Sequence, residues 1–244
     1  MSGVTTIVTG PRTRAGAAVV ERALANGDSV HVLARHADDH AALSGGDVTV
    51  LRVDQDVDLL GAGDGPVRLV VCALGPVHPD AAHADAELES AHVRRDLGAI
   101  ERLLVATSGR PVGVVLVSSV IALAPGPDRR HYGGWKCLVE QRLASVVART
   151  SPRATFSVVY PGRLVDGPAR RRVPGLHTTY RGLAAAVDIL GRSSRTRISG
   201  IDARLWLVMH GARLLLTTVR PPRASTPDPS LELHLSADDR NSHP

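Results

Sequence analysis

Short apolar runs alternate with longer segments of helical spacing through residues 4–160 of this chain. Runs of four to eight apolar residues bounded by turn residues are typical of buried strands, whereas apolar residues three and four apart indicate a helix. The predicted strands are 4–8, 28–34, 47–53, 67–73, 112–119 and 155–160, and the predicted helices are 14–27, 87–107 and 132–150. This alternation predicts an α/β fold: a Rossmann-type, doubly wound parallel sheet that binds its ligand at the carboxyl ends of the strands.

The composition changes near residue 220, where Pro, Ser and Asp become frequent. Because neither a repeat nor a linker divides the preceding residues, we expect one domain over 1–220 and a flexible tail over 221–244. An additional edge strand over 230–235 is the alternative for part of that tail. The polar segment 163–180, rich in Gly and Pro, is interpreted as a loop that closes over the ligand site.

The net charge of +5 does not indicate nucleic-acid binding. Such binding uses a basic patch with stacking aromatic rings, whereas the arginines here are spread along the chain and only 170–172 form a dense run. The chain has two Trp, three Tyr and one Phe. We therefore expect no nucleic-acid partner.

Localisation is predicted from what the sequence lacks. The N-terminus has neither the charged start nor the long apolar stretch of a signal peptide. The apolar segment 205–216 is short and contains His210 and Arg213, which argues against a membrane span. It is interpreted as core or as a subunit interface, which leaves a homo-oligomer open. Two cysteines without paired spacing and eleven scattered histidines predict no metal site. We expect a cytoplasmic protein.

The turn after the first predicted strand reads TGPRTRAG (9–16). A glycine-bearing turn that leads into a helix is an anion site, because backbone N–H groups and the helix dipole face the ligand. A three-glycine fingerprint would have another glycine between the two in this stretch. A tight strand-to-helix turn accounts for both glycines equally well. The candidate anion-binding residues are Gly10, Arg12, Thr13, Arg14 and Gly16.

Arg35 stands at the end of the second predicted strand. In a dinucleotide-binding fold this position faces the adenosine ribose, where an acid accepts from the 2′-hydroxyl and an arginine suits a 2′-phosphate. A solvated charge at a strand end is the alternative. The position therefore favours NADP over NAD.

Ser119, Tyr132 and Lys136 resemble the active site of the short-chain dehydrogenases/reductases, and Lys136 is the only lysine among 29 basic residues. The similarity spans residues 4–165 and makes the chain resemble a divergent or atypical member. The matching motifs are TGPRTRAG (9–16), CALG (72–75), VLVSS (115–119), YGGWK (132–136) and YPG (160–162). The resemblance implies cofactor contacts from the turn residues above and from Arg35, Asp54, Ala73, Gly75, Lys136, Pro161 and Gly162.

The chemistry that this resemblance implies is NADPH-dependent reduction of a carbonyl group on a small molecule, as in a ketoreductase of secondary metabolism. Tyr132 would supply the proton. Lys136 follows Tyr132 by four residues and therefore lies on the same helix face. It would lower the pKa of the tyrosine and hold the nicotinamide ribose. Ser119 would orient the carbonyl oxygen. Gly133 and Gly134 are poor helix residues and weaken this spacing unless the fold holds the first turn.

Three departures from the family pattern leave other functions open. The middle glycine of the turn is replaced, and CALG (72–75) keeps only the frame of Ala73 and Gly75 where the family often has an asparagine-rich stretch. Segment 92–98 offers Arg94, Arg95 and Asp96 where an asparagine often supports the lysine. The alternatives are a non-redox epimerase or dehydratase that uses the same site, and a catalytically silent NADP-binding protein.

Overall fold

The computed structural model describes residues 3–34, 47–52, 65–74, 86–126, 129–167, 176–191 and 195–219. Residues 1–210 form one compact unit around a seven-stranded sheet of order β3-β2-β1-β4-β5-β6-β9. Every neighbouring pair in this sheet is parallel, so the predicted Rossmann-type α/β fold is confirmed. Its strands are β1 (Thr5–Thr9), β2 (Ser29–Ala34), β3 (Val48–Arg52), β4 (Val67–Val71), β5 (Val112–Val117), β6 (Thr155–Pro161) and β9 (Thr196–Ser199).

Three of the helices match the predicted ones. They are α1 (Arg14–Ala25), α3 (Ala86–Ala106) and α5 (Arg130–Thr150). The structure adds elements that the sequence did not predict: the seventh strand β9 of the main sheet, the helices α4 (Val120–Leu123), α6 (Tyr180–Leu190) and α7 (Ile201–Val219), and a two-stranded parallel sheet of β7 (Leu164–Val165) and β8 (Thr178–Thr179). The apolar segment 205–216 lies within α7. The predicted tail over 221–244 and edge strand over 230–235 lie outside the described residues.

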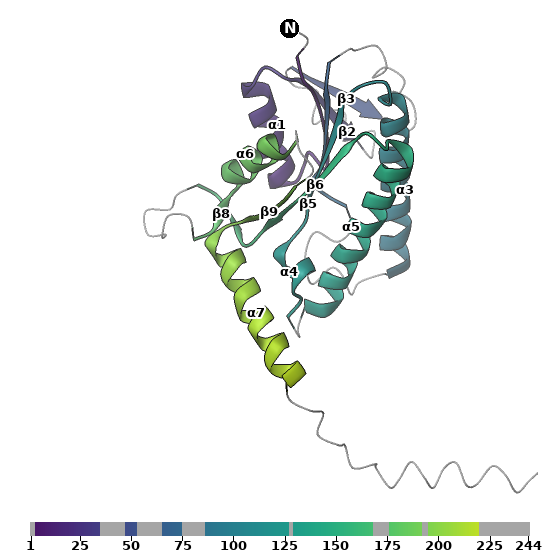
Figure 1. The fold of residues 1–244 in the computed structure, drawn as a ribbon. Coiled ribbons are helices and arrows are strands. Elements are labelled where there is room, and N and C mark those ends of the chain that lie inside the picture. The colour runs from purple at the N-terminus through teal and green to yellow at the C-terminus, as the bar shows by residue number, and fades with distance from the viewer. Residues whose placement is uncertain are drawn as a thin grey trace, which may run out of the picture. The chain divides into compact units, whose positions relative to one another are not determined.

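Helices cover both faces of the sheet (Figure 1). Neighbouring residues on one strand belong to different cores: Ile7 packs in the core shared with α3 and α5, and Val8 packs in the core shared with α1 and α6. Leu69 and Val70 of β4 divide in the same way. Burial on both faces explains why β5 reads as a continuous run without polar alternation. Of the helices in the described parts of the chain, none has the length and hydropathy needed to cross a membrane.

The sheet order changes direction at β1, which has β2 on one side and β4 on the other. In doubly wound sheets the ligand crevice lies at the carboxyl ends of the strands at such a point. Gly10, directly after β1, has φ +66°, and a Cβ there would lie 2.5 Å from the Ala73 Cβ that follows β4. A side chain at residue 10 is therefore excluded both by conformation and by space.

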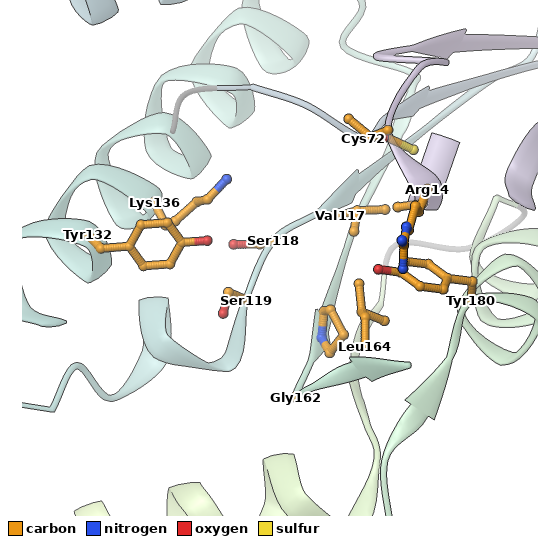
Figure 2. A pocket seen from close by; sticks show the side chains of 13 residues that line it. Arg14, Cys72, Val117, Ser118, Ser119, Tyr132, Lys136, Gly162, Leu164 and Tyr180 are labelled. Carbon is orange, nitrogen blue, oxygen red and sulfur yellow. The ribbon is translucent and has the colours of Figure 1, made fainter. Parts of the chain in front are cut away.

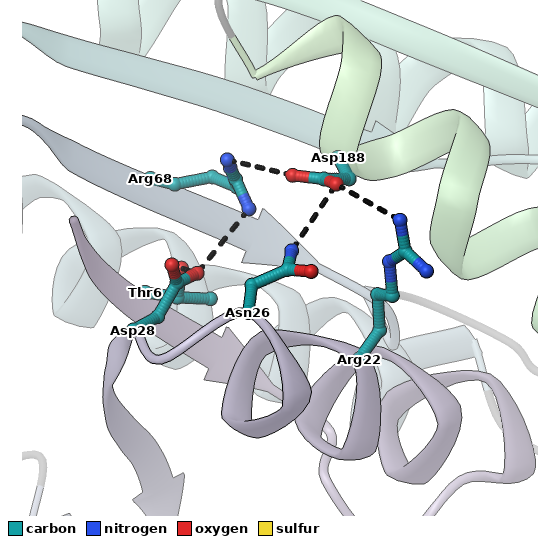
Figure 3. A network of polar contacts seen from close by, with 6 residues as sticks. All are labelled: Thr6, Arg22, Asn26, Asp28, Arg68 and Asp188. Atoms are coloured by element: carbon teal, nitrogen blue, oxygen red, sulfur yellow. Dashed lines mark hydrogen bonds and ion pairs between the residues drawn. The ribbon is translucent and has the colours of Figure 1, made fainter.

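A polar network fixes α1 and α6 against β4 at the opposite, amino-terminal end of the strands (Figure 3). Arg68 of β4 is only 5% exposed and pairs with Asp28 at 3.4 Å and with Asp188 of α6 at 2.9 Å. Asn26, at the end of α1, donates to the same Asp188 at 3.1 Å, and Thr6 donates to Asp28 at 2.6 Å. Each buried charge in the network has a partner of opposite charge, so the network can hold α1 and α6 against the sheet. The other ends of these two helices reach the crevice.

Candidate active site

A cavity of about 650 Å³ opens at the crevice between the start of α1, the end of β5, α5 and the end of β6 (Figure 2). Tyr132, Lys136, Ser118 and Ser119 lie on one side of the view, and Arg14 and Tyr180 lie on the other. The lining residues are Thr13, Arg14, Ala15, Cys72, Val117, Ser118, Ser119, Tyr132, Lys136, Pro161, Gly162, Leu164 and Tyr180. The three predicted catalytic residues therefore line one cavity together with Thr13 and Arg14 of the predicted anion turn.

Tyr132 and Lys136 lie one turn apart on the face of α5 that packs against the sheet, and each is 7% exposed. The Lys136 Nζ is 5.7 Å from the centroid of the Tyr132 ring, within the range of a cation–π contact. It also donates to the backbone oxygen of Leu74 at 3.4 Å, directly after β4. The ammonium is thus held in a buried position between the tyrosine ring and the Leu74 carbonyl.

The first turn of α5 is held by close packing of Gly133 on α4. A Cβ at residue 133 would lie 2.6 Å from the Pro125 Cβ and 2.8 Å from the Ile121 oxygen, whereas a Cβ at Gly134 would meet nothing within 4 Å. The absence of a side chain at residue 133 lets the short helix approach and support the turn that carries Tyr132. The tertiary packing offsets the low helix propensity of the two glycines.

The two glycines give a matched pair of variants. Gly133→Ala is expected to destabilise the fold by ~1–3 kcal/mol through overpacking and to displace Tyr132. Gly134→Ala, one residue on, is expected to stabilise it by ~0.5–1 kcal/mol because alanine loses less backbone entropy in a helix. Urea unfolding of both variants measures the two effects. Equal stability of the two variants would contradict the packing account.

Ser118 and Ser119 have different partners at the end of β5. Ser119 is the N-cap of α4, where its Oγ accepts from the Ile121 N–H at 3.4 Å. Ser118 donates its hydroxyl to Glu140 of α5. The contact at Ser119 uses the oxygen as an acceptor, so its O–H can still donate to a bound oxygen. This geometry favours Ser119 over Ser118 as a donor toward the cavity.

Burial sets the ionisation of two cavity groups. It raises the pKa of Tyr132 above its usual value, and the guanidinium of Arg129 partly opposes that shift. The tyrosine is therefore protonated at neutral pH in the ligand-free site, rather than having the lowered pKa expected from the sequence. Burial also raises the pKa of Cys72 to about 12, so its thiol stays protonated and is a poor nucleophile.

The turn before α1 is built from Gly10, Thr13 and Gly16. Thr13 is the N-cap of α1: its Oγ1 accepts from Gly16 N–H at 3.0 Å and donates to Gly10 O at 2.8 Å. A Cβ at residue 16 would lie 2.3 Å from that same Gly10 oxygen. Thr13 and Arg14 thus stand in place of the middle glycine of the three-glycine pattern: Thr13 caps α1, and Arg14 begins the helix at the cavity wall.

The other predicted cofactor residues fall into three groups. Pro161 and Gly162 line the cavity at the end of β6. Ala73 packs against Gly10 and does not line the cavity. Arg12 is exposed on the turn and does not line the cavity either. The predicted positions that lie outside the described residues are Arg35, Asp54 and Gly75.

Comparisons with solved structures identify the fold. A short-chain dehydrogenase from Burkholderia cenocepacia J2315 in complex with NADP is 21% identical, covers 90% of this chain and 99% of its own, and has a TM-score of 0.63. A short-chain dehydrogenase from Streptomyces avermitilis is 20% identical over 89% and 96% of the two chains, with a TM-score of 0.60. The alternative dihydrofolate reductase 1 from Brucella canis complexed with NADP is 18% identical over 81% and 92%, with a TM-score of 0.58. The chain has the fold of the short-chain dehydrogenases. No protein-family model and no curated protein matches the sequence.

Within this short-chain dehydrogenase fold, the sequence interpretation missed two groups at the site. Tyr180 begins α6 after the N-cap Thr179, whose Oγ1 accepts from Gly182 N–H at 3.0 Å. The capping threonine could have indicated the start of this helix inside the segment that was interpreted as a loop. Glu140 lies behind the cavity, and its signal was the i+4 spacing from Lys136. In the described part of the chain, no group of three His, Cys, Asp or Glu side chains is placed to hold a metal ion.

Proposed function

We propose that this protein is an NADPH-dependent reductase of the short-chain type that reduces a carbonyl group on a small molecule. The observation that carries the proposal is the meeting of Ser119, Tyr132 and Lys136 with the start of α1 in one cavity. The NADP complexes of two structures with the same fold support the choice of cofactor.

The residues present fit a dinucleotide. A Cβ at Gly10 or Gly16 would collide with Ala73 or with the Gly10 oxygen, so the two glycines let the turn close tightly before α1, whose N-terminus lies at the cavity wall with Arg14. A helix N-terminus with a nearby guanidinium suits a diphosphate. Lys136 would hold the nicotinamide ribose, and Pro161 and Gly162, which line the same cavity, would contact the cofactor as well. The further proposed contacts are Arg12, Thr13, Arg35, Asp54, Ala73 and Gly75.

NADPH supplies a hydride when it is bound, and the chain's own residues orient the substrate and deliver the proton. The Ser119 hydroxyl donates to the carbonyl oxygen and fixes its direction. Tyr132, protonated at neutral pH because burial raises its pKa, gives its proton to the same oxygen as negative charge develops there. The buried Lys136 ammonium beside the ring then stabilises the phenolate that remains.

Arg14 provides a test of the cofactor site. Its side chain is 72% exposed and pairs with Asp166 at 2.7 Å, a contact that is weak in solvent and that a bound phosphate can replace. Arg14→Ala is expected to weaken NADPH binding by about tenfold, since a charged hydrogen bond to phosphate is lost. Fluorescence titration with NADPH at low and high salt measures this loss, which high salt should reduce.

Asp166→Asn is the matched control for Arg14→Ala. It releases the guanidinium without removing it, so NADPH should bind at least as tightly as to the wild-type protein. Titration with NADH shows which phosphate group Arg14 binds. If Arg14→Ala loses equal affinity for NADH and NADPH, Arg14 binds the diphosphate. If it loses affinity for NADPH alone, Arg14 binds the 2′-phosphate. Unchanged affinity for both nucleotides would remove Arg14 from the proposed site.

The reaction is tested by incubating the purified protein with NADPH and a panel of aldehydes, ketones and quinones. Loss of the near-ultraviolet absorbance of NADPH should depend on the carbonyl compound, and an alcohol should form in equal amount. An epimerase or dehydratase would convert its substrate without net NADPH loss. Binding of NADPH without conversion of any member of a broad panel would instead favour the silent alternative.

A further inference from the structure

Glu140 continues the stripe of Tyr132 and Lys136 by one more turn of α5. Its carboxyl group lies behind the cavity wall and accepts two hydroxyl hydrogen bonds. Ser118 donates to Oε1, and the Tyr160 hydroxyl of β6 donates to Oε2 at 2.7 Å. Both carboxyl oxygens are therefore used as acceptors, which is the pattern of an ionised carboxylate.

The charges around Glu140 place it under the influence of Lys136. Burial raises the pKa of Glu140, and the two hydroxyl hydrogen bonds and the positive charge of Lys136 oppose that shift. The other titratable groups near Glu140 are Tyr160 on β6, whose pKa is raised by burial and by Glu140, and Cys137 on α5. Ser118 and Tyr160 are neutral, so Lys136 is the opposite charge that the carboxylate meets along its helix.

An ionised carboxylate at this position changes what Lys136 does to Tyr132. A lone ammonium favours the phenolate and lowers the tyrosine pKa, whereas a nearby negative charge has the opposite effect. The carboxylate offsets part of the ammonium charge. Burial raises the pKa of Tyr132, and the guanidinium of Arg129 partly opposes that shift. The carboxylate and the burial both favour the protonated tyrosine, which is the form that donates a proton to a carbonyl oxygen.

We propose that Glu140 is a positioning residue that acts on Tyr132 through Lys136: its negative charge holds Tyr132 in the protonated form and biases the site toward reduction. The proposal rests on the proposed function, because it assigns Tyr132 the role of proton donor. Alcohol oxidation, which needs the phenolate, then becomes efficient only at more alkaline pH.

The ionisation of Tyr132 can be measured without substrate, because the chain has only three tyrosines. The phenolate absorbance of the ligand-free protein is recorded at an alkaline pH where circular dichroism shows the native fold, with and without Tyr132→Phe. The difference isolates Tyr132. Adding Glu140→Gln, which keeps the size of the side chain and removes its charge, should raise the phenolate fraction of Tyr132 by about threefold or more.

Two controls separate the charge from the structural role of Glu140. Glu101→Gln removes a half-buried acid of α3 that pairs with Arg149, and it should leave the phenolate fraction of Tyr132 unchanged. Glu140→Asp keeps the charge and should restore a low phenolate fraction. If Glu140→Gln does not fold, Glu140→Met removes the same charge and carries the same expectation. An unchanged or smaller phenolate fraction in the charge-free variant would overturn the proposal.

Turnover distinguishes this inference from the proposed function. If the wild-type protein reduces no carbonyl compound, the proposed function fails while the Tyr132 titration still decides whether Glu140 controls its ionisation. Where turnover is found, Glu140→Gln should move the alkaline limb of the reduction profile to lower pH. An unmoved limb would contradict the role of Glu140 even if Tyr132→Phe is inactive.

Discussion

Tyr132→Phe is expected to lower kcat for carbonyl reduction by about 10³-fold while leaving the Kd for NADPH nearly unchanged. The phenyl ring retains the packing of a residue that is 7% exposed, and only the proton-donating hydroxyl is lost. The effect should fall on kcat because the proton is needed in the transition state and not for binding. Steady-state kinetics and NADPH titration of the same preparation measure both quantities.

Tyr180→Phe is the matched control, since it removes a second tyrosine hydroxyl from the residues that line the cavity. It should have a much smaller effect on kcat, because Tyr180 begins α6 and is not on the helix face that carries Lys136. A fully active Tyr132→Phe variant, or equal losses in the two variants, would exclude Tyr132 as the proton donor.

Lys136→Arg is expected to lower turnover by about 100-fold although it keeps the positive charge. The Lys136 side chain is buried, with its Nζ directed between the Tyr132 ring and the Leu74 carbonyl. A guanidinium is planar and larger than an ammonium, so it cannot occupy that position with the same contacts. The displaced charge should also weaken NADPH binding, because the proposed contact with the nicotinamide ribose is lost.

The reverse exchange on the same helix provides the control. Arg142 is exposed on α5, and Arg142→Lys should leave both kcat and the Kd for NADPH unchanged. Kinetic and binding measurements on the two variants test whether a compact ammonium is required at residue 136 alone. Wild-type turnover by Lys136→Arg would show that charge without geometry is sufficient there.

The sheet was predictable because burial on both faces leaves a direct trace in the sequence. Residues 69–71 of β4 and 114–117 of β5 are apolar at successive positions. The helix α6 was not predicted, because Tyr180 and its N-cap Thr179 follow a polar segment rich in Gly and Pro. The short helix α4 was missed as well, since four residues carry no measurable helical period.

The site was predictable to the extent that it depends on local spacing. The i, i+4 relation places Tyr132 and Lys136 on one face of α5, and the strand end places Ser119 beside them. The role of Glu140 depends on partners from β5 and β6, which only the folded chain brings together. The raised pKa of Tyr132 likewise follows from burial, a tertiary property that the spacing does not encode.

The most direct test of the proposed function is to follow the hydride itself. The protein is incubated with NADPH deuterated at both C4 positions and with a carbonyl compound from the panel, and the product is examined by mass spectrometry and proton NMR. We expect one deuterium on the new carbinol carbon of each alcohol formed, with an equal amount of NADPH oxidised. Conversion of the substrate without deuterium transfer, or without loss of NADPH, would contradict the assignment of this protein as an NADPH-dependent carbonyl reductase.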